Sequence, residues 1–387
     1  MLVGPRACGK TTTAVRHAAT VLRLDTERGS DALRADADAA LGDRAEPVLL
    51  DEWQALPTVM GAVKRAVDAD RRPGRFLITG SARSNADERL WPGTGRVVIL
   101  PMYPLTVAEI LGRPLQPFVD RVVAGESLHG DAASPDLADY LRLALRGGLP
   151  EPALALSQAG ARRWLGTYAD QVALRDARAH GHGPDSARLR RYLEALAINS
   201  AGTPQDRTIY ETAGVDRRTA QAYEQLLSDL VVVDHLPAWS TNRLKRLSRT
   251  PKRYLIDSGL MAGILHLDLE DVLNDGVLLG AVIDTFVVAQ LRAETTAART
   301  RYRLSHLRDQ NGRREVDVIV ELPRGRLIGI EIKASTGVRR ADARHLSWLR
   351  DSTGESFVTG VVFHTGQDTF NLDDRIVATP ISALWAT

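Results

Sequence analysis

The chain has few of the features that mark secreted, disulfide-stabilised or membrane proteins. It has one cysteine, Cys8, in 387 residues, which excludes an internal disulfide framework and a cysteine-rich zinc site. Its apolar runs are short, and Asp284 breaks the one near residue 283, so no membrane span is expected. Acidic and basic residues number 48 and 50, a formal net charge of +2, which gives no global case for attraction to nucleic acid. We therefore expect a soluble cytoplasmic protein with about two or three domains.

Lysine is also scarce, because only five of the 50 basic residues are lysine and the other 45 are arginine. An ammonium is a compact point charge and a guanidinium a planar fork, so the two are not interchangeable. A lysine retained against this bias is more often needed as lysine. Lys10 and Lys333 fall inside the two strongest chemical motifs, whereas chance explains Lys64 and Lys245 equally well.

The strongest motif is a phosphate loop, because residues 4–11 read GPRACGKT and match G-x-x-x-x-G-K-[ST]. Such a loop turns backbone N–H groups toward phosphates, its lysine neutralises β/γ oxygens, and its threonine offers a hydroxyl to Mg²⁺. Residues 11–22 have few helix breakers and predict the helix that follows. Only three residues precede the loop, so we expect either a very short first strand or a true start upstream of Met1. The predicted nucleotide contacts in this segment are Gly4, Pro5, Arg6, Ala7, Cys8, Gly9, Lys10, Thr11 and Thr12.

A second segment, residues 47–52, is a short apolar run that ends in two acids. It predicts a buried parallel strand that delivers carboxylates to its C-terminal edge. Asp51 would hold Mg²⁺, directly or through water, and Glu52 would polarise an attacking water. A kinase does not need such a base, so the pair favours hydrolysis. The alternative is an ordinary helix N-cap.

A third predicted strand covers residues 75–79 and ends in polar residues. Thr79 or Ser81 could sense the γ-phosphate there. Arg83 and Arg96 are candidates for an arginine that stabilises charge on the nucleotide, in cis or from a neighbouring chain. In a chain with so many arginines, solvated surface groups are the alternative.

The middle of the chain reads as helical and then as a winged helix. Residues 103–180 are mostly helical, with a sharp break at 147–151. From 186 to 265, three helices (189–198, 206–212 and 217–230) precede two strands (231–236 and 253–256), with a turn at Gly214 that suits helix-turn-helix geometry. A packing or dimerisation module is an equally weighted alternative. The candidate contacts to a groove of nucleic acid are Arg217, Arg218 and Gln221. The candidate contacts to phosphate are Arg243, Lys245 and Arg246, which begin a basic run that continues through Arg249, Lys252 and Arg253.

The C-terminal part carries a second constellation of charged residues. An amphipathic helix over 277–291 bears Asp284, and strands over 314–321 and 327–333 form a hairpin through 323–325. Glu331 and Lys333 lie two residues apart and share a face, and an antiparallel partner can bring Asp317 opposite them. Asp317 and Glu331 would then share Mg²⁺ or Mn²⁺ with Asp284 completing the acids, while Lys333 orients water at a scissile phosphate. The alternative is a cross-strand salt bridge.

Several of these motifs together resemble prokaryotic AAA-type ATPases. The resemblance rests on the phosphate loop, on Leu-Leu-Asp-Glu-x-Gln over 49–54 and on Thr-Gly-Ser over 79–81. It extends to residues 147–151, 251–260, 315–317 and 331–333. These ATPases carry a C-terminal domain of unknown function with a PD-(D/E)XK nuclease-like fold, in which the position of Asp284 is more often glutamate. The resemblance implies ATP binding, ATP hydrolysis, a winged-helix middle and a nuclease-like end.

The expected fold class is therefore α/β, with a parallel-sheet P-loop domain, a helical and winged-helix middle and a C-terminal restriction-endonuclease-like domain. The predicted boundaries are 1–110 for the ATPase, 111–184 for a helical lid or linker, 185–265 for the winged helix and 270–387 for the nuclease-like domain. The first hypothesis is an ATPase that drives a metal-dependent nuclease acting on DNA or RNA. The alternative is an ATP-switched module that binds DNA or protein, with a catalytically silent C-terminal scaffold. A homo-oligomer is compatible with both.

Overall fold

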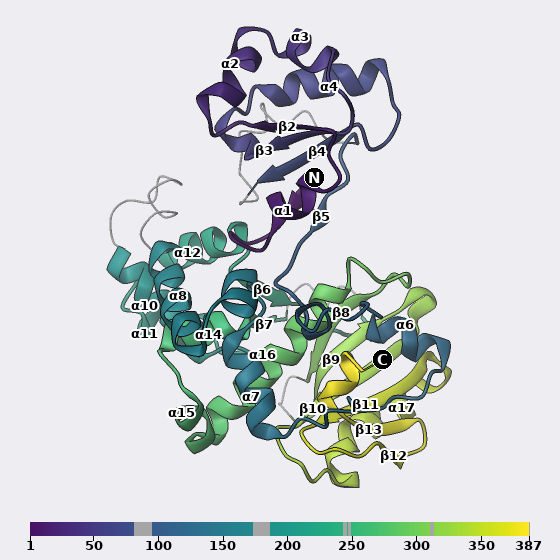
Figure 1. The fold of residues 1–387 in the computed structure, drawn as a ribbon. Helices are drawn as coiled ribbons and strands as arrows, with labels where there is room; N and C mark the ends of the chain where they lie inside the picture. Colours follow the sequence, from purple (N-terminus) through teal and green to yellow (C-terminus); the bar gives the residue numbers. More distant parts are fainter. Residues whose placement is uncertain (81–94, 173–185, 243–245, 247–248, 310–312, 387) are drawn as a thin grey trace. The chain divides into compact units, whose positions relative to one another are not determined.

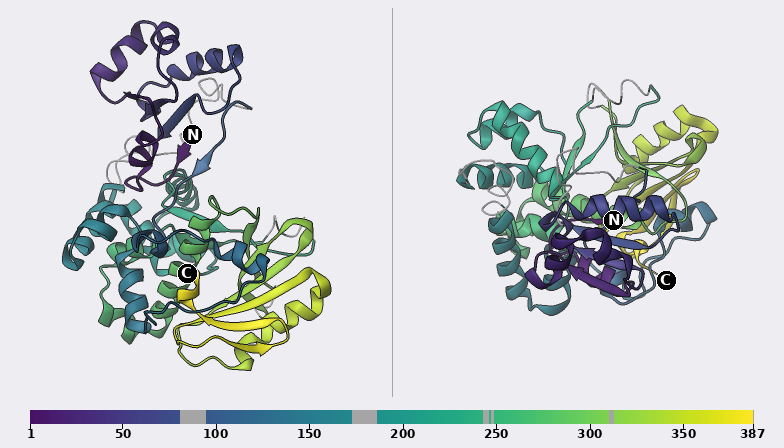
Figure 2. Two further views of the ribbon diagram at one scale, coloured as in Figure 1. Left: turned by 45° about the vertical axis from the view of Figure 1, so that its right-hand side comes forward. Right: turned by 90° about the horizontal axis from the view of Figure 1, so that it is seen from above.

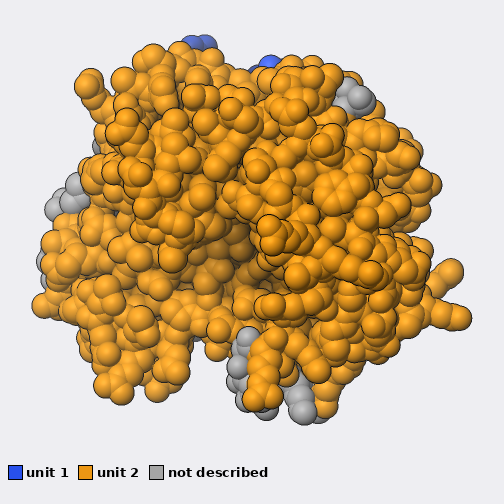
Figure 3. Space-filling model, turned by 90° about the horizontal axis from the view of Figure 1, so that it is seen from below, with its two compact units in different colours: residues 1–103, 227–231 blue, residues 104–226, 232–387 orange. Residues whose placement is uncertain are grey.

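The computed structural model describes residues 1–80, 95–172, 186–242, 246, 249–309 and 313–386. The chain forms two compact units, which Figure 3 shows in different colours. Unit 1 comprises residues 1–103 and 227–231, and unit 2 comprises residues 104–226 and 232–387. Each unit has a hydrophobic core of its own.

A parallel five-stranded sheet forms the centre of unit 1 (Figure 1). Its order is β2-β3-β4-β1-β5, and all neighbouring strands run parallel. The predicted buried strand is confirmed, because every residue of β3 is buried between β2 and β4. One strand, β4, therefore separates the phosphate-loop strand β1 from the acid-bearing strand β3. The bounds are β1 Leu2–Val3, β2 Thr20–Arg23, β3 Val48–Asp51, β4 Phe76–Gly80 and β5 Leu100–Pro101.

The helix predicted over 11–22 is wrong in its second half. Helix α1 ends at Val15, and Thr20–Arg23 forms the edge strand β2. The N–H groups of Ala19 and Thr20 both donate to the Pro47 carbonyl, at 2.9 and 3.2 Å, so pairing with β3 overrides the local helical pattern. The β-branched Thr20 and Val21 suit this strand. The helical elements of unit 1 are α1 Lys10–Val15, α2 Glu27–Ala35, α3 Ala37–Gly42, the 3₁₀ turn Trp53–Ala55 and α4 Val59–Ala69.

Unit 2 begins with the predicted helical segment. The break expected at 147–151 is present, because α7 stops at Gly147, whose φ is 71°. A single π turn, Glu151–Ala155, follows it before the next helix. The helices here are α5 Val107–Ile110, α6 Phe118–Ala124, α7 Leu137–Arg146 and α8 Gln158–Gln171.

The Gly147–Gly148 turn is held by a buried carboxylate from a distant part of the sequence. Asp257 is the N-cap of α14 (Ser258–Leu265) and accepts the Leu260 N–H at 2.8 Å. Its other oxygen accepts the Gly148 N–H at 2.6 Å. A Cβ atom at Gly147 would lie 2.2 Å from Asp257 Oδ1, so a side chain there would displace the carboxylate. Two segments that carried the family resemblance, 147–151 and 251–260, therefore meet at the buried carboxylate of Asp257. We call the contact of Asp257 with the Gly147–Gly148 turn the latch.

The elements expected of a winged helix follow in the predicted order. The turn between the second and third helices contains Gly214 with φ 64°. Strands β6 and β7 pair antiparallel, with Leu236 opposite Lys252. The bounds are α10 Ser186–Ile198, α11 Asp206–Thr212, α12 Arg217–Asp229, β6 Val233–Leu236 and β7 Lys252–Leu255.

A mixed six-stranded sheet dominates the C-terminal half of unit 2 (Figures 1 and 2). The predicted hairpin is confirmed, because β9 and β10 are antiparallel and a 3₁₀ turn at Pro323–Gly325 connects them. Helix α17 (Arg344–Thr353) packs on one face, where a Cβ at Gly329 would lie 2.7 Å from Leu346. On the other face, the ring of Phe363 lies 5.1 Å from that of Phe118 in α6. The order is β12-β13-β11-β10-β9-β8, with bounds β8 Arg303–Arg308, β9 Glu315–Glu321, β10 Leu327–Ile332, β11 Phe357–His364, β12 Phe370–Asp373 and β13 Ile376–Pro380.

Helix α16 (Gly276–Glu294) follows the short helix α15 (Leu269–Asn274). Among the described residues, α16 is the one helix long and apolar enough to cross a membrane. Its polar side chains bond to other elements of unit 2. Gln290 accepts the Val107 N–H at 2.8 Å, and Glu294 accepts the Phe118 N–H at 2.8 Å, so they cap α5 and α6. These contacts and the buried residues of its second half describe a core helix.

The buried Glu294 predicts a specific pH dependence of stability. Burial raises its pKa from 4.5 to about 8, so the folded protein keeps a proton that the unfolded chain releases. The folded state therefore binds more protons between these values, and stability falls as pH rises from about 5 to 8. Glu294→Gln keeps an oxygen for Phe118 N–H without the ionisation. We expect the unfolding free energy of wild type minus that of the variant to fall by about 1–3 kcal/mol from pH 5 to 8; a flat difference in urea titrations would contradict this.

Candidate functional site

The predicted phosphate loop connects β1 to the first turn of α1. Ala7 and Gly9 adopt left-handed backbone conformations, with φ of 58° and 94°. Gly4 is required by close packing, since a Cβ there would lie 2.2 Å from the carbonyl oxygen of Met102. The loop thus turns tightly beside the chain that follows β5. Of the other predicted contacts, Arg6, Ala7 and Thr12 are exposed, and Pro5 and Cys8 are buried.

Lys10 folds back over this loop. Its ammonium donates to the carbonyl oxygens of Gly4 and Pro5, at 3.0 and 2.6 Å. The side chain is buried, and that burial lowers the pKa of Lys10. Burial likewise raises the pKa of the neighbouring Cys8 thiol. The ammonium also lies 3.9 Å from the Cys8 sulfur. A buried ammonium that bonds to neutral carbonyls remains a strong potential partner for an anion.

Asp51, at the carboxyl end of β3, is the meeting point of three elements. Its Oδ1 accepts the hydroxyl of Thr11 from α1 at 2.7 Å and the hydroxyl of Thr79 from β4 at 2.5 Å. The sequence had predicted roles for all three residues in binding or sensing nucleotide, and the fold brings them to a single oxygen atom. Carboxylate and hydroxyl oxygens suit Mg²⁺, which takes few protein ligands besides substrate phosphates. The residues present therefore fit that ion.

Glu52 directly follows Asp51 and stands in a conformation that few non-glycine residues adopt. Its φ is 55°, and its carboxylate accepts a short hydrogen bond from the Gln54 side-chain amide. The 3₁₀ turn that begins at Trp53 fixes this segment, because Trp53 is buried. Gly80 at the end of β4 must lack a side chain, since a Cβ would lie 2.8 Å from Trp53 Nε1. The backbone therefore holds Glu52 beside Asp51 at the carboxyl edge of the sheet.

Arg96 does not join this group of residues in the structure described, and its contact with nucleotide stays a prediction. Its Nε lies 2.6 Å from Asp68 Oδ1, near the end of α4. Helix α4 leaves the carboxyl end of β3 and ends before the amino end of β4, so Asp68 lies at the opposite edge from the phosphate loop. Ser81 and Arg83 lie outside the described residues.

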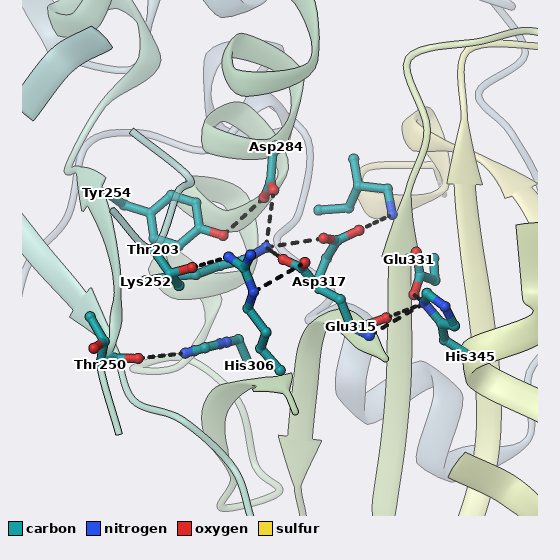
Figure 4. Close-up of polar contacts among 12 residues, drawn as sticks. Thr203, Thr250, Lys252, Tyr254, Asp284, His306, Glu315, Asp317, Glu331 and His345 are labelled. Atoms are coloured by element: carbon teal, nitrogen blue, oxygen red, sulfur yellow. Dashed lines mark hydrogen bonds and ion pairs between the residues drawn. The ribbon is translucent and has the colours of Figure 1, made fainter. Parts of the chain in front are cut away.

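The predicted C-terminal acids are gathered around a lysine. The ammonium of Lys252, on β7, lies 3.0 Å from Asp317 Oδ1, 3.5 Å from Glu315 Oε1 and 3.6 Å from Asp284 Oδ2. Figure 4 shows it pointing between Asp284 and Asp317. Its side chain is 3% exposed. We call Lys252, Asp284, Glu315 and Asp317 the lysine–acid cluster.

Further hydrogen bonds fix two of the acids. The Tyr254 hydroxyl donates to Asp284 Oδ1 at 3.0 Å, and the Ile332 N–H donates to Asp317 Oδ2 at 3.0 Å. Both oxygens of Asp317 therefore already have donors. Sequence reasoning missed this role of Lys252 and Tyr254, having placed Lys252 in a run that contacts phosphate. The scarcity of lysine, and its place in the 251–260 motif, were the signals for a specific role.

Glu331 lies next to the cluster with a different cation. The antiparallel register places Val318 opposite Ile330, so the neighbouring Asp317 and Glu331 come together as predicted. Lys333 Nζ lies 2.9 Å from Glu331 Oε2, a salt bridge between residues two apart in the sequence and not the cross-strand salt bridge of the alternative interpretation. Glu331 Oε1 is buried, has no hydrogen-bond partner among the described residues and lies 3.9 Å from His345 Nδ1.

Burial and the charges of Lys252 and Lys333 together determine the pKa values of these acids. Burial alone lowers the pKa of Lys252, but the charges of Asp317 and Asp284 raise it well above its ordinary value. Burial raises the pKa of Asp317, yet Lys252 and Lys333 bring it below its usual range. Burial raises the pKa of Asp284 to about 6 and that of Glu331 to about 8. Asp317 is thus the firmly ionised partner of Lys252.

The lysine–acid cluster does not fit the predicted divalent metal. Mg²⁺ and Ca²⁺ bind oxygens at about 2.0–2.6 Å, and the ammonium of Lys252 already occupies the position that Asp317 and Asp284 share. Among the described residues, no three His, Cys, Asp or Glu side chains form a group that could hold a metal ion. The predicted metal set Asp284, Asp317 and Glu331 is therefore corrected: two members surround Lys252, and Glu331 pairs with Lys333.

The predicted nucleic-acid contacts separate into two groups. The first group, Arg217, Arg218 and Gln221, is exposed at the start of α12, and its contact with a groove of nucleic acid stays a prediction. The members of the basic run that the structure describes do not form a free patch, because Arg246 pairs with Glu321 at 2.8 Å and Lys252 is buried. Arg253 likewise pairs with Glu224 and Asp206. Arg243 and Lys245 lie outside the described residues.

Comparisons with known proteins agree with the site in unit 1. A family model described as an AAA domain matches residues 1–111. Two models described as domains of unknown function, DUF8612 and DUF4143, match residues 137–271 and 279–384. The chain is 30% identical over 396 residues to the uncharacterized protein Rv2008c of Mycobacterium tuberculosis and to the uncharacterized protein Mb2031c of Mycobacterium bovis. These matches cover 100% of this chain and 81% of each relative. No solved structure matches.

Proposed function

The chain belongs to an AAA-type P-loop ATPase family with a C-terminal domain of unknown function, and on that premise we propose that it binds and hydrolyses ATP in unit 1. One observation carries the proposal: the hydroxyls of Thr11 and Thr79 both donate to Asp51 Oδ1, and Glu52 directly follows Asp51. Three separate segments supply these residues, and a chance match to a loop motif does not require them to meet. The arrangement supports phosphate binding and water activation in the same place.

Lys10 and the loop backbone would bind the phosphates. On binding, the Lys10 ammonium would exchange the carbonyls of Gly4 and Pro5 for β/γ oxygens, a stronger charge-assisted interaction. The N–H groups at the start of α1 add a positive dipole to the same region. Thr11 and Asp51 would hold Mg²⁺, which offsets phosphate charge when bound.

Glu52 is the residue proposed to activate water. A general base must be able to accept a proton and must be held in place. The Glu52 carboxylate is oriented by Gln54 and by the buried Trp53 that follows it. Thr79, at the end of the neighbouring strand β4, is the residue proposed to sense the γ-phosphate.

For unit 2, the geometry favours the alternative hypothesis, an ATP-switched binding module whose nuclease-like site is silent. Lys252 occupies the position where the nuclease hypothesis needs a metal. The exposed Arg217, Arg218 and Gln221 on α12 are the proposed contacts to a nucleic-acid partner.

Nucleotide binding by variants of Lys10 tests the proposal. Lys10→Ala removes the only side-chain cation of the motif's G-K-[ST] triplet, and we expect ATP affinity to fall at least about 10-fold, since a charge-assisted bond is worth roughly 1.5–3 kcal/mol. Lys64→Ala, at an exposed lysine of α4 in the same unit, is the matched control and should bind normally. Equilibrium dialysis with labelled ATP and Mg²⁺ measures both. Equal retention by Lys10→Ala and wild type would contradict the assignment.

A further inference from the structure

In the lysine–acid cluster, three carboxylates surround one cation, the ammonium of Lys252. An ammonium is a compact point charge whose three donors can point to carboxylates in separate directions, whereas a guanidinium fixes its donors in one plane. The three distances from Lys252 Nζ, 3.0, 3.5 and 3.6 Å, involve three separate carboxylates from β9 and α16. In a chain with 45 arginines, this buried position is held by lysine.

Lys252 and a divalent metal cannot occupy the cluster together. A metal bound to Asp317 Oδ1 at about 2.0–2.6 Å would lie in the space taken by an ammonium 3.0 Å from that oxygen. The two cations would also repel each other at low dielectric. The cluster therefore holds one cation or the other.

A second observation concerns a carboxylate oxygen beside the lysine–acid cluster. Glu331 Oε1 is buried without a hydrogen-bond partner among the described residues, and Glu331 neighbours Asp317 across the hairpin. Figure 4 shows Asp317 between Lys252 and Glu331. Several carboxylate oxygens thus lie close together here, and the positive charge between them comes from the protein.

We propose that Lys252 is a built-in cation that keeps divalent metal out of the lysine–acid cluster, so that removing its charge converts the cluster into a metal site. The lysine belongs to β7, which pairs with β6, whereas the acids belong to the C-terminal helix and sheet. The contact is therefore also an internal clamp between the predicted winged helix and the C-terminal domain. It depends on no property of the ATP site.

Metal binding by the full-length protein tests this without nucleotide. Mn²⁺ is titrated by calorimetry or by the loss of its free-ion spectrum into wild type, Lys252→Met, Asp317→Asn and the double variant. Methionine keeps the length of the lysine stem and removes the charge. Lys64→Met, at an exposed lysine, is the matched control.

We expect Lys252→Met to bind one more Mn²⁺ per chain than wild type, at least about 10-fold more tightly than any wild-type binding at these acids. The double variant should lose that ion, while Asp317→Asn alone should bind as wild type does. A wild-type Mn²⁺ site that Asp317→Asn abolishes would overturn the proposal, as would a folded Lys252→Met that gains no ion. If Lys252→Met does not fold alone, its thermal transition is measured again in Mn²⁺. Recovery of the transition in Mn²⁺, with no recovery in the double variant, supports the proposal. Failure of Mn²⁺ to restore the transition contradicts the proposal.

Discussion

Replacing Glu52 by glutamine is expected to slow ATP hydrolysis by about 100- to 1,000-fold while leaving ATP binding within a few-fold of wild type. Glutamine cannot take a proton from water but keeps an oxygen that can accept from Gln54. It changes neither the loop nor Asp51. Binding and turnover should therefore separate, which is the signature of a residue that acts on the attacking water.

Two measurements make this result specific. Phosphate release gives turnover, and retention of labelled ATP gives binding, in the same preparations. Glu27→Gln is the matched control, because Glu27 is an exposed glutamate of α2 in the same unit. If Glu52→Gln hydrolyses ATP at the wild-type rate, another group activates the water and the role given to Glu52 is wrong.

Truncating Asp257 is expected to cause the largest loss of stability. Asp257→Ala leaves the buried N–H groups of Gly148 and Leu260 without their acceptor. Each orphaned donor costs roughly 1–3 kcal/mol, and the cap of α14 is lost with them, so we expect about 3–5 kcal/mol. Urea unfolding followed by circular dichroism measures the change.

The control for Asp257 is a carboxylate with the same local role at the surface. Asp275 caps α16 and accepts the N–H groups of Val277 and Leu278, at 2.9 and 3.0 Å, but it is exposed. Asp275→Ala should cost only about 1 kcal/mol, because water replaces the lost acceptor. Equal losses for Asp257→Ala and Asp275→Ala would contradict the latch between α14 and the Gly147–Gly148 turn.

Much of unit 1 could be predicted from the sequence because its signals are local. The loop motif, the buried run before Asp51 and the polar end of the next strand each predicted their element. Thr79 donates to Asp51 at that strand end, where the sequence predicts a polar sensor of the γ-phosphate. The end of α1 could not be predicted, because residues 20–23 leave the helical pattern only through pairing with β3. Such pairing is a tertiary effect that local propensity does not report.

The C-terminal site shows where sequence reasoning stops. The alternation of β9 and β10 predicted that Asp317 and Glu331 come together, and the register agrees. The identity of the cation could not be predicted, because Lys252 comes from a strand 65 residues away from Asp317. Its neighbours in sequence are basic and suggested a phosphate-binding run. Only the fold shows that Arg253 pairs with Glu224 while Lys252 turns into the acids.

Phosphate release from ATP by the wild-type protein, in Mg²⁺ and again in EDTA, tests the central claim most directly. The arrangement of Lys10, Asp51 and Glu52 predicts release that requires Mg²⁺ and that falls to background in Lys10→Ala. Absence of release from folded wild-type protein that retains ATP would contradict hydrolysis. Release that persists undiminished in Lys10→Ala would show that the phosphate loop is not its source.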